Sequence, residues 1–197
     1  MLKRLLILLT LLYIPSVAFA TGQIADLIVF QGEKYQLIGM ASGHLVTPQD
    51  YGMEPIPIST ACWRGFYSTY VIKDELIFLE TMTTSIKDGN YQPINKISPR
   101  LVNHKYEYRN VNLRVPFTGK LRIAKDFIWD HYVHMGFQKA SAFKVVLDLS
   151  FKDGKLQNIN DISAEAEKRR GEFKQRYGAG NIPQGIDEAF SLDLDLY

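Results

Sequence analysis

A strict alternation of apolar and polar side chains from Phe143 to Phe151 is the feature that most constrains the fold of this chain. Every second residue from Phe143 onward is apolar, whereas the residues between them include Lys144, Asp148 and Ser150, and Val146 is the sole apolar exception. Side chains of a β-strand point alternately to opposite faces of a sheet, so this period predicts a strand with one buried face. Lys152, Asp153 and Gly154 then predict a turn, after which residues 155–159 pair back.

Similar short runs of β-branched and aromatic residues, separated by turn residues, occur along most of the chain from residue 26. They predict roughly eight to ten strands in all. The main segments are an opening hairpin of 26–31 and 35–38, a long surface loop at 39–59, strands at 60–72 and 76–82, a hairpin of 111–115 with 120–123, and a terminal strand at 190–196.

The period changes to that of a helix only near residue 163. Ser163 is expected to be the N-cap, Gly178 is expected to end the helix, and the apolar residues between lie on one side at helical spacing. Ile162, Ala166, Phe173 and Tyr177 form this stripe. The sequence therefore predicts a mainly β fold, with α+β as the variant: a single antiparallel β-rich domain over residues 21–197 with one late amphipathic helix.

Residues 1–20 have the pattern of a signal peptide. Lys3 and Arg4 precede a short apolar run that ends at Ile14, and Ala18 and Ala20 fit the small-residue pattern of a cleavage site. An uncleaved anchor is the main rival, but a membrane span needs about eighteen or more apolar residues. We therefore expect cleavage after Ala20, a periplasmic or secreted protein, and no stable membrane span once the signal is removed.

Removal of this leader also removes two positive charges, and the remaining chain then carries 21 basic and 21 acidic residues. A formally neutral protein has no general attraction for phosphate, so a nucleic-acid partner is not expected. The lone cysteine, Cys62, cannot form a disulfide within the chain, and we expect it to be buried.

The chain contains no strong catalytic motif. The densest group of polar and aromatic residues is DFIWDHYVHMGFQ at 126–138. If this segment were helical, Asp126, Asp130, His131 and His134 would share a face and the two histidines could bind a metal ion. If it is extended, the histidines point to opposite faces and the site disappears. No metal or cofactor is predicted, and a small hydrolase that uses these histidines and carboxylates remains the alternative function.

A second group, Trp63 and Arg64 with Phe66, Tyr67 and Tyr70, combines flat rings with a guanidinium. Such side chains can stack on sugar rings or hold a partner protein, although aromatic residues also favour strands because they pack well. We therefore predict an exported, non-catalytic binding domain that recognises a protein or a glycan. The sequence favours a protein without enzymatic activity over an enzyme. The candidate binding residues are Trp63, Arg64, Tyr67, Trp129, His131, His134 and Phe137.

Three segments also carry a resemblance: TACWRGFYSTYVIKDELIFL at 60–79, PFTGKLRIAKDFI at 116–128 and YVHMGFQKASAFKVVLDLSFKDGKL at 132–156. They resemble those of an uncharacterised family of small bacterial hypothetical proteins, and they cover about the middle half of the chain. The resemblance implies one continuous domain. It implies no activity and no functional residue.

Overall fold

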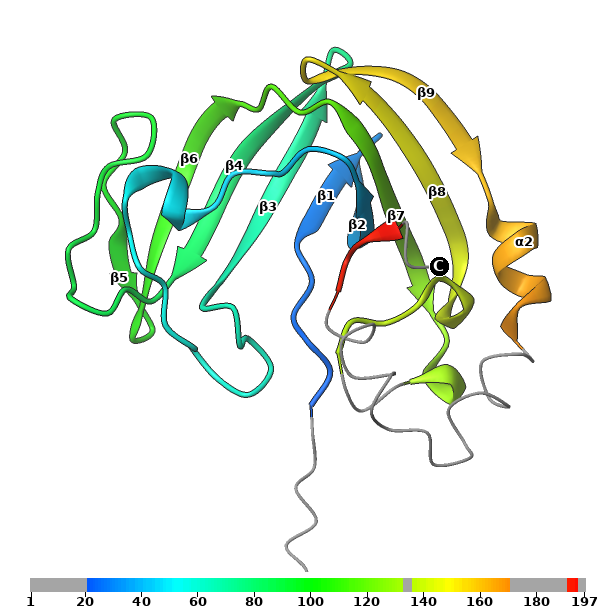
Figure 1. Ribbon diagram of the computed structural model, residues 1–197, viewed down its shortest axis with the longest axis horizontal. Coiled ribbons are helices and arrows are strands. Elements are labelled where there is room, and N and C mark those ends of the chain that lie inside the picture. Colours follow the sequence, from blue (N-terminus) through cyan, green and yellow to red (C-terminus); the bar gives the residue numbers. More distant parts are fainter. Residues whose placement is uncertain (1–20, 133–135, 171–190, 195–197) are drawn as a thin grey trace, which may run out of the picture.

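The computed structural model describes residues 21–132, 136–170 and 191–194. The described chain is mostly β, with one nine-stranded sheet and a single short helix late in the sequence, which confirms the predicted fold class (Figure 1). The strands are β1 (Leu27–Phe30), β2 (Glu33–Ala41), β3 (Phe66–Lys73), β4 (Leu76–Thr84), β5 (Arg100–Val102), β6 (Lys105–Arg114), β7 (Gly119–Phe127), β8 (Phe143–Lys152) and β9 (Lys155–Asp161). The helices are α2 (Ser163–Lys168) and the 3-10 turns η1 (Pro48–Tyr51), η2 (Trp129–His131) and η3 (Ala140–Ala142).

The sheet curls back on itself. Its strand order is β3-β1-β2-β7-β8-β9-β4-β6-β5, and β3 also pairs with β4. Strand β4 therefore pairs with β3 along one edge. Along its other edge it pairs with β6 and, at Leu76 opposite Lys155, with β9. Strands β1 and β3 run parallel, and the remaining strand pairs run antiparallel. Figure 1 shows the resulting arch, with its strands around a common interior and an open end at the bottom.

Four tight hairpins build much of this sheet. Each has a two-residue loop in which both residues have positive φ: residues 31–32, 74–75, 103–104 and 153–154. Positive φ at both positions is the type I′ geometry, whose twist matches that of the flanking strands. The predicted opening hairpin, the turn after residue 73 and the return of residues 155–159 are therefore confirmed.

The predicted hairpin of residues 111–115 with 120–123 is wrong. Both segments are strands, but β6 pairs with β4 and β5, whereas β7 pairs with β2 and β8. The connection between them is held by other partners, because the Val115 N–H donates to the Ile77 carbonyl and the Phe117 carbonyl accepts from Gly154 N–H. Alternation identifies the buried face of a strand and does not identify its neighbour.

The sheet has apolar cores on both faces. The larger core fills the interior of the arch and includes Leu121, Ile123 and Leu149, whereas the smaller one lies on the outer face and includes Ala124 and Val146. Helix α2 covers the smaller core with Ala166. Val146, the exception to the alternation of β8, is thus apolar because a helix covers it.

The ends of the predicted helix differ in part from the structure. Ile162 is the N-cap and Ser163 is the first helical residue of α2, with its hydroxyl accepting from the Val146 N–H at 3.0 Å. Ile162 and Ala166 pack against the smaller core as expected. Phe173, Tyr177 and Gly178 lie outside the described residues.

Three further expectations meet the structure only in part. The predicted loop at 39–59 begins later, after β2 ends at Ala41, and the predicted strand at 60–72 begins only at Phe66. Of the predicted terminal strand, the structure describes residues 191–194, where Asp193 forms an isolated parallel bridge with Met40. The predicted signal peptide lies outside the described residues. In the described part of the chain, no helix has the length and apolar character to cross a membrane.

Candidate functional site

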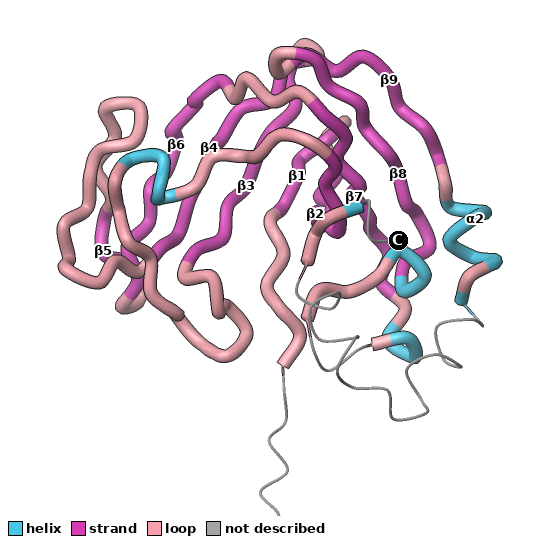
Figure 2. The backbone as a smooth tube through the Cα atoms, in the orientation of Figure 1, coloured by secondary structure: helices cyan, strands magenta, loops and turns pink. Residues whose placement is uncertain are grey.

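The two tryptophans of the chain, Trp63 and Trp129, are both exposed, at 66% and 78% of their surface. The loop 52–65, the residues 128–132 and 136–138, and the N-terminal residues 21–26 lie together at the open end of the arch, where Figure 2 shows loops and short helical turns instead of strands. These segments also carry further exposed apolar side chains. We call this group of side chains the open-end surface: Ile24, Ile56, Trp63, Trp129 and Tyr132.

The loop that carries Trp63 is tightly bonded. The Cys62 N–H donates to the Ser59 carbonyl, and the Cys62 carbonyl accepts from the N–H groups of Ile58 and Gly65. Gly65 has a φ of +81°, and a Cβ there would lie 2.5 Å from the Ile56 carbonyl oxygen. Only glycine fits such a position, so Gly65 fixes the path of the chain immediately after Trp63 and Arg64.

Arg64 is bound by a buried carboxylate. Asp26 is 4% exposed, and its two oxygens accept from the Arg64 guanidinium at 3.0 and 2.6 Å while Oδ1 also accepts from the Ser68 N–H at 2.6 Å. The guanidinium carbon lies 4.7 Å from the ring centre of Phe66 and 5.9 Å from that of Phe137. Arg64 and Phe137, predicted from two separate segments, therefore lie in one cluster.

Cys62 adjoins this cluster and is almost fully buried. Its thiol donates to the Phe66 carbonyl at 3.4 Å. Burial is the main cause that raises the pKa of the Cys62 thiol, with the Arg64 charge acting in the opposite direction. A buried thiol with a raised pKa is a poor nucleophile, and the expected burial of Cys62 is confirmed.

Tyr67 lies on β3 with Thr83 opposite it on β4. Its ring is half-buried, and the Lys105 amine lies 5.8 Å from the ring centre. This is a cation–π distance at a partly exposed site. Tyr67 therefore belongs to the sheet wall next to the Trp63 loop.

Trp129 rests on the edge of an aromatic cluster centred on Phe127. The Phe127 ring makes edge-to-face contacts with Trp129 at 5.2 Å, Tyr132 at 6.3 Å and Phe143 at 5.2 Å. Phe143 is fully buried, so the cluster leads from the core to the surface. The Trp129 ring is thus supported by protein on one side and open to water over most of its area.

The N-terminal segment joins the two tryptophan regions. Its backbone donates on one side to the Ala61 carbonyl, from Ile24, and on the other side to the Gly136 carbonyl, from Gln23, each at 2.7 Å. The Gln23 side chain also accepts from the Trp63 N–H at 3.1 Å. Segments more than sixty residues apart in the sequence are therefore held at one end of the molecule by residues 21–26.

The described residues of the hydrolase alternative lie on two different elements. Asp126 is exposed on β7, and Asp130 and His131 lie in the three-residue turn η2, so these three residues do not share the face of one helix. His134 lies outside the described residues. Across residues 21–132, 136–170 and 191–194, no three His, Cys, Asp or Glu side chains gather closely enough to hold a metal ion.

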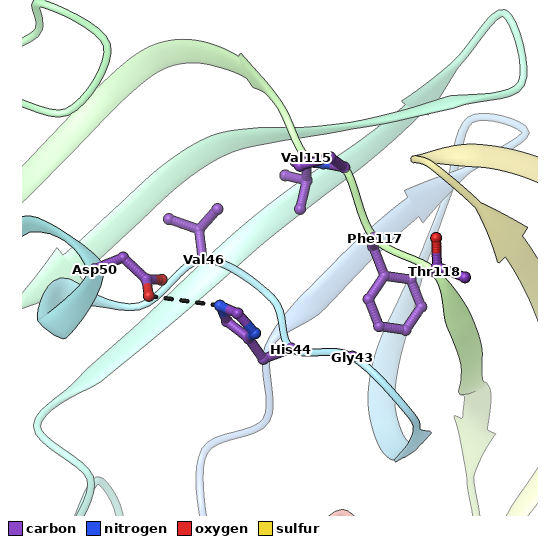
Figure 3. Close-up of a pocket in the computed structure, with 8 residues that line it drawn as sticks. Gly43, His44, Val46, Asp50, Val115, Phe117 and Thr118 are labelled. Carbon is purple, nitrogen blue, oxygen red and sulfur yellow. Dashed lines mark ion pairs between the residues drawn. The ribbon is translucent and has the colours of Figure 1, made fainter.

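Sequence reasoning missed a pocket of about 260 Å³ between the loop after β2 and the corner before β7 (Figure 3). His44 Nε2 lies 3.5 Å from Asp50 Oδ1, and Asp50 Oδ2 accepts from the Thr47 N–H at 2.7 Å. A carboxylate can orient an imidazole in this way for proton transfer. The hydroxyl that lines the pocket, that of Thr118, instead accepts from the Asp153 N–H at 2.9 Å. The signal in the sequence was the capping pattern of Thr47 and Asp50 three residues apart.

Comparison of the chain with protein-family models, with curated proteins and with solved structures gives no significant match.

Proposed function

We propose that the protein is an exported, non-catalytic binding domain that holds a protein or glycan partner on the open-end surface. The observation that carries the proposal is the exposure of both tryptophans at the same end of the fold. Tryptophan is highly buried on average in folded proteins, and an exposed indole contributes little to stability. A fully buried aromatic side chain contributes about 150–250 Å² of contact area, and most of that area is still available at Trp63 and Trp129 for a partner to cover.

The surroundings of the two tryptophans favour binding. The Phe127 ring supports the Trp129 ring edge-to-face, whereas at Trp63 the bond to Gln23 and the close packing of Gly65 fix the backbone. Groups that are already positioned lose less conformational entropy on binding, and preorganised aromatic residues are typical of binding hot spots. The same flat rings stack on the apolar faces of sugars, so a glycan and a protein both suit this surface.

A small hydrolase that uses Asp126, Asp130, His131 and His134 is the alternative function, and it has less support. Asp126 and Asp130 are both exposed to water on the surface, and the described structure forms no enclosed site around them. Zinc analysis of the purified protein, with and without a chelator, tests the metal form of this alternative.

Export belongs to the same proposal. The apolar run of residues 5–14 and the small residues Ala18 and Ala20 support passage through a membrane and a periplasmic or secreted location. N-terminal sequencing of the protein recovered from its own cells and medium tests this part. A product that begins at Thr21 agrees with it, and a product that retains residues 1–20 contradicts it.

Capture of a partner tests the central proposal. The immobilised protein is exposed to an extract of its own cells and medium, beside the variants Trp63→Ala, Trp129→Ala and Ile159→Ala. Ile159 is the matched control because it is 45% exposed and lies on β9 opposite Leu149, in a strand that Figure 1 shows running from the closed top of the arch, away from the open end. We expect both tryptophan variants to lose the captured species while the wild type and Ile159→Ala retain it, with unfolding temperatures unchanged. Equal capture by all four proteins would refute the proposal.

A further inference from the structure

One edge of strand β2 is longer than the strand that covers it. Strand β1 pairs with residues 33–36 of β2, and β2 continues to Ala41. Just beyond this pairing the Leu37 N–H donates to the carbonyl of Asp26, and three residues later the Met40 N–H donates to the carbonyl of Leu192. The last residues of β2 therefore offer a backbone donor at an edge that β1 does not reach.

The C-terminal segment Ser191–Leu194 occupies this edge. Asp193 and Met40 form a parallel bridge, and Leu192 packs against the larger core. Leu194 lies directly on Gly39, where a Cβ would collide with the leucine side chain. The edge thus combines a backbone donor that β1 does not engage, an apolar contact and the absence of a side chain at Gly39, which together suit an extended strand.

We propose that the β2 edge at Gly39–Ala41 is a peptide-binding site, which the C-terminal segment of the chain fills in the structure. Its ligand is an extended peptide with two leucines separated by one acidic residue, bound by parallel strand addition. In this mode backbone hydrogen bonds give affinity, and contacts of alternate side chains give specificity. This site is separate from the open-end surface, and the proposal stands independently of the function assigned to that surface.

The contact between Ser191–Leu194 and the β2 edge is weak enough for another peptide to replace the segment. Among the described residues, the segment pairs with β2 through a single isolated bridge, between Asp193 and Met40, and Leu192 and Leu194 are both only partly buried. The segment keeps its place as part of the same chain, because a tethered ligand has an effective concentration on the order of millimolar. An added peptide therefore competes poorly with the C-terminal segment for the β2 edge until Leu192 and Leu194 are replaced.

A labelled peptide with the sequence of residues 191–197 tests the site by fluorescence anisotropy on the full-length chain. The double variant Leu192→Ser/Leu194→Ser vacates the edge, and we expect it to bind the peptide at least about tenfold more tightly than the wild type does. Adding Gly39→Ala to that variant should abolish the gain, and so should replacing both leucines of the peptide by serine. Equal binding to wild type and double variant, or no effect of Gly39→Ala, would overturn the proposal.

Amide hydrogen exchange provides a second test that does not depend on the double variant. In the otherwise native chain, Gly39→Ala should speed exchange of the Met40 amide by about tenfold or more, because its acceptor on Leu192 moves away. The Leu37 amide, whose acceptor is Asp26, is the internal control and should not change. Unchanged exchange at Met40 would show that the segment is not displaced and would overturn the proposal.

Discussion

Asp26 and Arg64 form a two-pronged ion pair, at 3.0 and 2.6 Å, beside the loop that carries Trp63. The Asp26 carboxylate is nearly inaccessible to water, whereas a quarter of the Arg64 side chain is exposed. Paired guanidinium–carboxylate bonds fix orientation as well as distance. The pair therefore ties the N-terminal segment to the start of β3 and holds the open-end surface together.

Replacement of Asp26 by Asn should reduce the free energy of unfolding by about 3 kcal/mol, because it leaves the Arg64 charge poorly compensated in a mostly buried site. Urea unfolding measures this change. Glu54→Gln is the control, since the Glu54–Lys87 pair at 3.2 Å is well exposed on both sides and should contribute about 0.5 kcal/mol. Similar effects of the two substitutions would show that the buried pair has no special role.

Alanine substitutions at Gly65 and Gly32 separate two costs to stability, that of backbone strain and that of steric collision. Both have φ near +80°, but a Cβ at Gly32 would meet nothing within 4 Å, whereas one at Gly65 would meet the Ile56 backbone. We expect Gly32→Ala to cost about 1 kcal/mol of stability, from the left-handed backbone alone. Gly65→Ala should cost about 2 kcal/mol more, because backbone atoms must move. Equal unfolding midpoints for the two variants would contradict the tight packing of the Trp63 loop.

The buried phenol of Tyr108 makes the stability of the fold fall as the pH becomes alkaline. Burial raises the pKa of Tyr108 to about 12, and its hydroxyl donates to the Gln92 carbonyl at 2.6 Å. In the unfolded chain the phenol loses its proton near pH 10, so the stabilisation is complete below that pH and is lost as the pH rises toward 12. Unfolding followed from pH 10.5 to 11.5 should show a slope about 1 kcal/mol per pH unit smaller for Tyr108→Phe than for the wild type. Identical slopes would show that Tyr108 ionises normally in the folded protein.

Periodicity located most strands because one face of each is buried, as in β8. It did not identify strand neighbours: β6 and β7 are consecutive, yet they pair with different strands, and their connection is bonded to Ile77 and Gly154. It also did not explain Val146, whose burial depends on a helix that follows later in the sequence.

The candidate site was predictable only in its parts. The rings of Trp63 and Trp129 were recognised from residue type, but their common location depends on hydrogen bonds from residues 21–26, which carry no distinctive motif. Asp26 lies thirty-eight residues from Arg64, and no local pattern relates the two. His44 and Asp50 were missed because they lie in a loop without a regular period.

Iodide quenching of tryptophan fluorescence tests the central proposal most directly. Trp63→Phe and Trp129→Phe each leave a single indole, so that the accessibility of the two rings is measured separately. Without a partner, both should be quenched almost as strongly as free tryptophan, and both should become protected when the captured species is added. Full binding of that species with unchanged quenching of both indoles would contradict the assignment of the open-end surface as the binding site.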